Sequence, residues 1–168
     1  MGMKKVAVIT AGGDAPGMNA ALRAIVRIGE KKGLLLFGIK RGYTGLVYNE
    51  VEPLSRRSVS GIINLGGTIL KTSRCEEIKT DIGLEMAKRT IEYNNFDAMI
   101  VIGGDGTFRG ALDIKKKIDI PIVGVPASID NDIYGTDETI GFDTAVNTAV
   151  KAIDYLRDTA YSLSLIHI

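Results

Sequence analysis

The sequence KVAVIT (residues 5–10) runs directly into AGGDAPGMN (residues 11–19), so an uninterrupted apolar run meets a glycine turn. Apolar runs of this length without polar alternation are typical of strands buried on both faces of a parallel sheet. Glycines let a backbone approach a ligand closely, and Pro16 suits the first turn of a following helix. This stretch therefore predicts a buried strand, a tight turn and a helix.

The same alternation of strand and helix patterns continues along the chain. Three further apolar runs occupy residues 34–39, 98–102 and 121–125, and stretches with apolar residues at helical spacing lie between or after them. The repeated order predicts an α/β fold, a doubly wound, mostly parallel sheet with helices on both faces. The predicted buried helix stripes are Ala21, Leu22, Ile25, Val26 and Ile28; Ile82, Leu84, Met86, Ala87 and Ile91 within residues 80–93; and Val146, Ala149, Val150, Ile153 and Leu156, capped by Asp143 or Thr144.

Composition limits the classes of partner that we expect. The 168 residues are 45% hydrophobic with a net charge of +1, so no global field draws the chain to nucleic acid or to a membrane. No apolar run approaches membrane-spanning length. Cys75 is the only cysteine, which excludes an internal disulfide and fits a cytoplasmic protein. Residues 1–57 hold ten Lys/Arg against four Asp/Glu, and charge alone favours a solvated surface over an anion site.

Gly-Gly-Asp occurs twice where a predicted strand passes into a predicted helix, at residues 12–14 and 103–105. Ligands of open α/β sheets bind beyond the carboxyl ends of the strands, so both turns are expected at one ligand. Backbone groups of Gly104, Gly106 and Thr107 can cradle phosphate oxygens, and Asp105 can hold Mg²⁺. The alternatives are tight turns without a ligand and an aspartate that only caps a helix.

Two further groups carry charge to the same predicted edge. Asp130 and Asp132 follow the run at residues 121–125, where one carboxylate can accept a hydroxyl proton and the other can support a metal. Arg74, in GGTILKTSR (residues 66–74), can neutralise phosphate charge during transfer. An acidic turn and a surface arginine are the alternatives. His167, the only histidine, receives no catalytic role.

In this order, the motifs resemble those of the ATP-dependent 6-phosphofructokinases. The match extends from about Lys4 to about Ala160, and its most specific parts are GGDAPGMNA (12–20), GGTILKTSR (66–74), GGDG (103–106) and IDNDIYGTDETIGFDTA (129–145). The resemblance implies the Rossmann-like first domain of such an enzyme. It also implies transfer of the γ-phosphoryl group of ATP to the 1-hydroxyl of fructose 6-phosphate with Mg²⁺, a step of glycolysis.

The resemblance implies a role for each matching residue. Gly13 would lie against the ATP phosphates, Arg74 would bridge the reacting phosphates, and Cys75 would lie beside the nucleotide. Asp105 would hold Mg²⁺ and Asp130 would be the catalytic base. The remaining positions would be Gly104, Gly106 and Thr107 on ATP, Ser128 on the transferred phosphate or the sugar, and Asp132 assisting the metal.

Other positions bear on the phosphate donor and on regulation. Pyrophosphate-using relatives tend to carry Asp and Lys where this chain has Gly106 and Ala127, so ATP is the expected donor. Ala127-Ser128 replaces the more usual Gly-Thr pair, and serine keeps the hydroxyl. The resemblance also implies an ADP or phosphoenolpyruvate effector site at Arg23, Arg27 and Arg56, and a homotetramer for the full-length family.

The resemblance covers about half of such an enzyme. We expect residues 1–160 to form the ATP-binding domain and residues 161–168 to be a tail unrelated to the family, with the sugar-phosphate domain outside the chain. The 168-residue chain alone is therefore not expected to be a competent kinase. Two alternatives stay open: a non-catalytic nucleotide-binding fragment, and a lipid or NAD kinase that shares the GGDGT loop.

Overall fold

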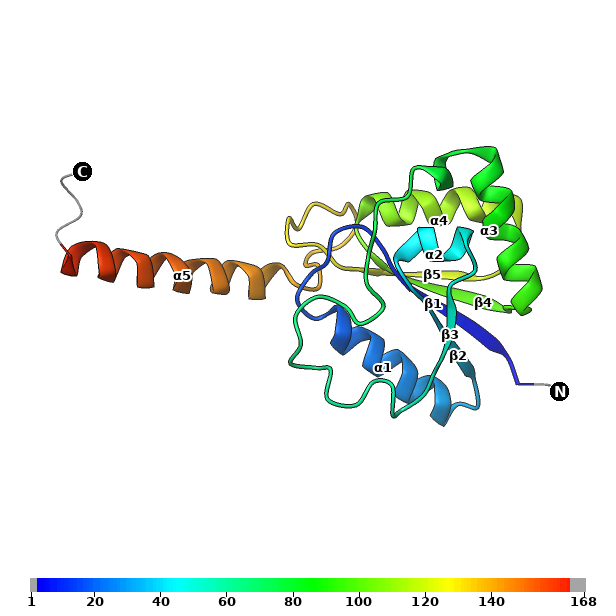
Figure 1. Cartoon of the computed structure of the whole chain (residues 1–168), viewed down its shortest axis with the longest axis horizontal. Helices are drawn as coiled ribbons and strands as arrows, with labels where there is room; N and C mark the ends of the chain where they lie inside the picture. Colours follow the sequence, from blue (N-terminus) through cyan, green and yellow to red (C-terminus); the bar gives the residue numbers. More distant parts are fainter. Residues whose placement is uncertain (1–2, 164–168) are drawn as a thin grey trace.

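The structure is a computed structural model that describes residues 3–163. A five-stranded sheet forms its centre, with helices on both faces (Figure 1). In chain order the elements are β1 (Lys5–Thr10), α1 (Met18–Lys31), β2 (Leu35–Ile39), α2 (Gly42–Val47), β3 (Val51–Leu54), the 3₁₀ helix η1 (Glu77–Lys79), α3 (Asp81–Asn94), β4 (Ala98–Gly103), α4 (Asp105–Lys117), β5 (Ile122–Pro126) and α5 (Phe142–Ser162).

The strand order is β3-β2-β1-β4-β5, and only β3 runs antiparallel to its neighbour. The mostly parallel, doubly wound fold is therefore confirmed. The chain builds outward from β1 to β2 and β3, then returns to place β4 on the other side of β1. This reversal between β1 and β4 is the switch point at which open α/β sheets bind ligands.

Two apolar layers hold the helices against the sheet. The helices α2, α3 and α4 lie on one face and α1 lies on the other (Figure 1). Buried side chains of the first three helices form one layer, and those of α1 with residues 54–70 form the second. Ile9 and Met99 point into the first layer, whereas Val8 and Ile102 point into the second. Burying one such side chain contributes about 1.5–3 kcal/mol, so the two central strands anchor both layers.

Three of the predicted buried stripes need correction. Ile28 and Ile82 are 55% and 76% exposed. At about 100° per residue, Ile28 lies on the far side of α1 from Val26, and Ile82 lies on the far side of α3 from Ile91. The helix α5 buries none of its residues, so its whole predicted stripe is exposed, and Figure 1 shows it extending away from the sheet.

The starts of two helices also differ from the prediction. Gly17, at φ 93°, caps α1, so Pro16 precedes the helix instead of occupying its first turn. Gly141, at φ 106°, caps α5 in place of Asp143 or Thr144, which lie inside the helix. Both caps need the left-handed conformation that glycine adopts without steric cost.

The edges of the sheet were the least predictable part. The helix α2 and the strand β3 have no counterpart in the sequence-based prediction. Val123 on β5, the outermost strand, is 58% exposed, so the prediction of strands buried on both faces is wrong for this strand.

No helix among residues 3–163 is long and apolar enough to cross a membrane. The predicted tail at 161–168 lies outside the described residues from 164 onward, while Tyr161 and Ser162 continue α5.

Candidate active site

The two Gly-Gly-Asp turns lie side by side at the switch point. Thr10, at the end of β1, pairs with Ile102 of β4, and the amide of Ala11 donates to the Ile102 carbonyl at 3.0 Å. The next strand continues the row, because Gly103 pairs with Pro126 at the end of β5. Three loops that were predicted separately therefore leave the sheet at adjacent positions along one edge.

Close packing between the two turns explains one of the glycines. A Cβ atom on Gly103 would lie 2.4 Å from both the Ala11 carbonyl oxygen and Thr107 Oγ1, so only glycine fits without displacement. Thr107 Oγ1 donates to the same carbonyl at 3.0 Å, and its amide donates to the Gly104 carbonyl at 3.0 Å. Thr107 is buried and joins the turns, and its predicted contact with ATP stays a prediction.

The helix α4 begins at Asp105 and points its N-terminal end at this edge of the sheet. The first amides of a helix and its positive dipole end favour a bound anion such as phosphate. Asp105 forms an ion pair with Arg109 at 2.8 Å, and both side chains are more than half exposed. Exposed pairs of this kind contribute about 0–1 kcal/mol, so a stronger cation can replace Arg109 at small cost.

The acidic loop after β5 is folded by its own polar groups. Asn131 has φ 52°, and its Oδ1 accepts from the Thr139 amide at 2.9 Å. Thr139 Oγ1 donates to the Ser128 carbonyl at 2.7 Å. These bonds leave Asp130 and Asp132 exposed on the loop, where Ser128 Oγ donates to Asp132 Oδ1 at 3.3 Å and accepts from the Asp130 amide at 3.1 Å. Two carboxylates and a hydroxyl are thus held on one short turn.

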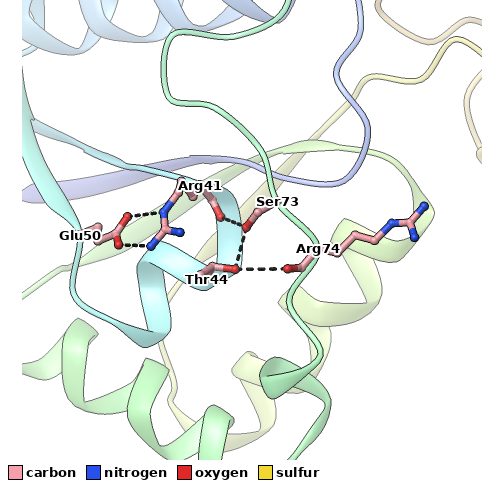
Figure 2. Close-up of polar contacts among 5 residues, drawn as sticks. All are labelled: Arg41, Thr44, Glu50, Ser73 and Arg74. Atoms are coloured by element: carbon pink, nitrogen blue, oxygen red, sulfur yellow. Dashed lines mark hydrogen bonds and ion pairs between the residues drawn. The ribbon is translucent and has the colours of Figure 1, made fainter.

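Arg74 and Cys75 reach the site from the segment between β3 and η1. The guanidinium of Arg74 extends away from the helix α2, while its carbonyl faces Thr44 (Figure 2). Cys75 is 8% exposed and its Sγ lies 3.5 Å from Glu77 Oε2. Burial raises the pKa of the Cys75 thiol, so the neutral thiol is the form present at neutral pH.

One open cleft of about 1070 Å³ collects these groups. Its volume suits a ligand the size of a nucleotide. Every residue predicted for the catalytic, ATP, substrate and metal roles lines it, namely Gly13, Arg74, Cys75, Gly104, Asp105, Gly106, Thr107, Ser128, Asp130 and Asp132. The structure therefore brings together the loops that the sequence predicted to meet, and the role of each residue stays a prediction.

Sequence reasoning missed several groups that line the cleft. Tyr43 from α2 is buried, and its hydroxyl donates to the Thr107 carbonyl; burial, with a smaller contribution from Asp113, raises its pKa. Lys79 lines the cleft and pairs with Glu76 at 2.7 Å. Arg109 could have been found, since it follows Asp105 at the i, i+4 spacing of helical ion pairs. The position of Tyr43 depends on α2, which carried no sequence signal.

The predicted effector residues lie outside this cleft. Arg23 and Arg27 are on α1, and the Arg23 Nη1 donates to the Val59 carbonyl at 2.6 Å. Arg56 follows β3 and pairs with Glu30 at 3.0 Å. Two of the three guanidinium groups therefore already have partners within the chain.

The donor set of the cleft fits a magnesium ion that is carried by a nucleotide. Among residues 3–163, no three Asp, Glu, His or Cys side chains gather into a metal site. Mg²⁺ is usually held by one or two carboxylates together with substrate phosphates and water, and not by a complete protein cage. Asp105, exposed at the start of α4, is a carboxylate of the required kind.

Comparison with known proteins places the chain in a family. The family profile described as Phosphofructokinase matches residues 5–168. The chain belongs to the phosphofructokinase family. It is 54% identical to the ATP-dependent 6-phosphofructokinase 1 of Thermus thermophilus over 160 residues, and 53% identical to the ATP-dependent 6-phosphofructokinase of Clostridium botulinum over the same length. These alignments cover 95% of this chain but 50% of each relative, so the chain spans about half their length.

Solved phosphofructokinase structures share the fold. The Pichia pastoris enzyme in the T-state superposes with a TM-score of 0.87 at 39% identity, over 92% of this chain and 18% of that one. The Saccharomyces cerevisiae enzyme gives 0.86 at 36% identity, over 95% and 24%. A pyrophosphate-dependent phosphofructokinase from Marinobacter aquaeolei gives 0.72 at 18% identity, over 83% and 37%, a likeness of fold alone.

Proposed function

We propose that the chain provides the nucleotide half of an ATP-dependent 6-phosphofructokinase. That enzyme transfers the γ-phosphoryl group of ATP to the 1-hydroxyl of fructose 6-phosphate. The observation that supports this best is the shared cleft at the switch point, which both Gly-Gly-Asp turns, Arg74 and the acidic loop line together. Phosphoryl transfer depends mainly on positioning and charge neutralisation, and these loops carry the groups for both.

The proposed roles follow from what each group offers. The N-terminal end of α4 and the open backbone at Gly13, where a Cβ atom would meet nothing within 4 Å, receive the phosphates. Arg74 balances the charge that moves during transfer. Asp105 would hold Mg²⁺ in place of Arg109, and the bound ion would neutralise charge on the phosphates of the nucleotide. Asp132 would support that ion.

Asp130 is proposed as the general base. It accepts the proton of the sugar 1-hydroxyl while the sugar oxygen forms its bond to the γ-phosphorus and the bond from that phosphorus to the β–γ bridging oxygen breaks, leaving ADP. Ser128 lies on the same turn, where its hydroxyl can donate to the transferred phosphoryl group. Asp130 is exposed, so a substrate hydroxyl can approach it directly.

Calorimetry on the purified chain tests the nucleotide half. We expect ATP with Mg²⁺ to bind in a one-to-one ratio, and Arg74→Ala to weaken binding by about tenfold or more, because hydrogen bonds to charged groups contribute about 1.5–3 kcal/mol. Arg157→Ala, on the outer end of α5, is the matched control. Absence of ATP binding in the wild-type chain would reject the proposal.

The reaction itself is tested in a chimera in which residues 4–160 replace the matching half of the Thermus thermophilus relative. We expect Asp130→Ser to lower kcat about 10²- to 10⁴-fold while sparing ATP affinity, and Asp119→Ser, a fully exposed carboxylate, to leave both unchanged. An acceptor panel of fructose 6-phosphate, diacylglycerol and NAD separates the sugar kinase from a lipid or NAD kinase. Wild-type turnover in Asp130→Ser would remove the base assignment.

Three further assignments remain proposals that rest on the family. The enzyme is expected to assemble as a homotetramer in the cytoplasm. Arg23, Arg27 and Arg56 are proposed to bind ADP or phosphoenolpyruvate as effectors.

The second candidate function for this chain is nucleotide binding without catalytic turnover, and the exposed surfaces of α5 and β5 favour it.

A further inference from the structure

Arg74 lies in a segment that forms no regular secondary structure. Residues 71–75 belong to no helix or strand. Among the described residues, no backbone–backbone hydrogen bond involves residues 72–75. A guanidinium that must lie over moving phosphate charge needs a fixed backbone behind it, since small misplacements of catalytic groups reduce rates strongly. Contacts outside the segment therefore have to fix it.

The ends of the segment are held by Thr10 Oγ1, which donates to the Lys71 carbonyl at 3.1 Å, and by the buried Cys75. Between them, two hydroxyl groups connect the segment to α2. Ser73 Oγ lies 2.7 Å from Thr44 Oγ1 and 2.8 Å from the Arg41 carbonyl oxygen, and Thr44 Oγ1 lies 3.4 Å from the Arg74 carbonyl oxygen (Figure 2). Each hydroxyl has one proton, so two protons serve three contacts. If Ser73 donates to Thr44, the Thr44 proton is free for the Arg74 carbonyl, and the two bonds together link α2 to the segment. If Ser73 donates to the Arg41 carbonyl, the Thr44 proton serves either Ser73 or the Arg74 carbonyl, so two of the three contacts are hydrogen bonds at one time.

Contacts at and within α2 hold Thr44, the member of the hydroxyl pair on this helix, in place. Arg41, at φ 56°, caps α2, and its guanidinium donates through Nε to Glu50 Oε2 at 2.8 Å and through Nη2 to Glu50 Oε1 (Figure 2). The Arg41 amide donates to the Leu70 carbonyl at 2.8 Å. Leu46 of α2 is fully buried. The position of α2 is thus fixed by its own contacts, and the hydroxyl pair can hold residues 71–75 against it.

We propose that Thr44 and Ser73 are positioning residues whose hydroxyl pair holds the Arg74 backbone against α2, so that its guanidinium stays over the phosphates of a bound nucleoside triphosphate. This inference rests on the proposed function for its ligand but not for the contact itself. Arg74 extends to the opposite side of the segment from the hydroxyl pair, so the pair acts on the phosphates only through Arg74 (Figure 2).

Binding of ATP with Mg²⁺ to the purified chain tests the coupling to Arg74. We expect Thr44→Val to weaken ATP binding about three- to tenfold, in line with one lost hydrogen bond, and Thr44→Ser to retain it. Combined with Arg74→Ala, Thr44→Val is expected to have no further effect. An equal loss in both backgrounds would mean a general structural role and would overturn the proposal. Thr148→Val on α5 is the control.

Alkylation of Cys75 by iodoacetamide tests the contact without any nucleotide. Ser73→Ala is the variant of choice, because Thr44 also contacts the Cys75 thiol and would change its pKa. We expect the rate constant of the thiolate, taken from a pH series, to rise about three- to tenfold in Ser73→Ala as the segment loosens. An unchanged rate constant in a variant that melts like wild type would overturn the proposal. If wild type binds no ATP, the proposed function fails, while the alkylation result still decides the contact.

Discussion

The two Gly-Gly-Asp turns have the same three residues but different surroundings. After Gly103 the helix begins at Asp105 itself, so the aspartate lies in its first turn. After the first turn the helix begins only at Met18, and Asp14 is left on a loop. The distance to the helix start therefore decides which aspartate lies at a helix N-terminus. The two copies of the tripeptide therefore share a location at the carboxyl ends of the strands, and they differ in the position of the aspartate relative to the following helix.

The largest expected difference concerns the glycines. A Cβ atom on Gly103 would lie 2.4 Å from a backbone oxygen, whereas one on Gly13 would meet nothing within 4 Å. We expect Gly103→Ala to destabilise the chain by about 3 kcal/mol, which lowers the Tm by about 6–12 °C. Gly13→Ala should leave the Tm unchanged and weaken ATP binding. Thermal melts and calorimetry check both, and equal Tm values would show that the turns are packed alike.

The next difference concerns the aspartates and magnesium. Asp105→Asn removes the carboxylate at the start of α4, so we expect ATP to lose about ten- to hundredfold in affinity with Mg²⁺ and little without it. Asp14→Asn is the matched variant on the other turn, with an expected change below about threefold. Titrations of ATP at several Mg²⁺ concentrations measure the effect. A larger loss in Asp14→Asn would exchange the roles of the two turns.

The contact between the turns should have a smaller effect. Thr107→Val keeps the shape of the buried side chain but removes the donor to the Ala11 carbonyl at 3.0 Å. We expect a loss of about 1–3 kcal/mol in the free energy of unfolding, because a buried acceptor is left unpaired. Urea unfolding measures it. Thr107→Ser should recover most of the loss, and no recovery would point to packing of the methyl group instead.

Sequence reasoning reached the fold and the loops for physical reasons that apply to some regions and not to others. The β1, β4 and β5 runs are apolar, and the carboxyl ends of parallel strands meet at one edge, so the sequence alone was enough to bring Asp105 and Asp130 together. Burial on α5 could not be predicted, because periodicity shows an apolar stripe and not what covers it. Tyr43 was missed because α2 has six residues and lacks a clear stripe.

The smallest expected effect is on Cys75, which reports on the cleft that both turns border. Burial raises its pKa, so alkylation should be slow at pH 7 and should rise about tenfold per pH unit until the thiol ionises, above the ordinary value near 8.5. Bound ATP is expected to slow alkylation by a few-fold in wild type. Gly13→Ala should shift this protection to higher ATP concentrations, and Asp105→Asn should do so only when Mg²⁺ is present. Protection that follows neither variant would mean that the nucleotide lies away from both turns, because Cys75 is the only thiol in the chain.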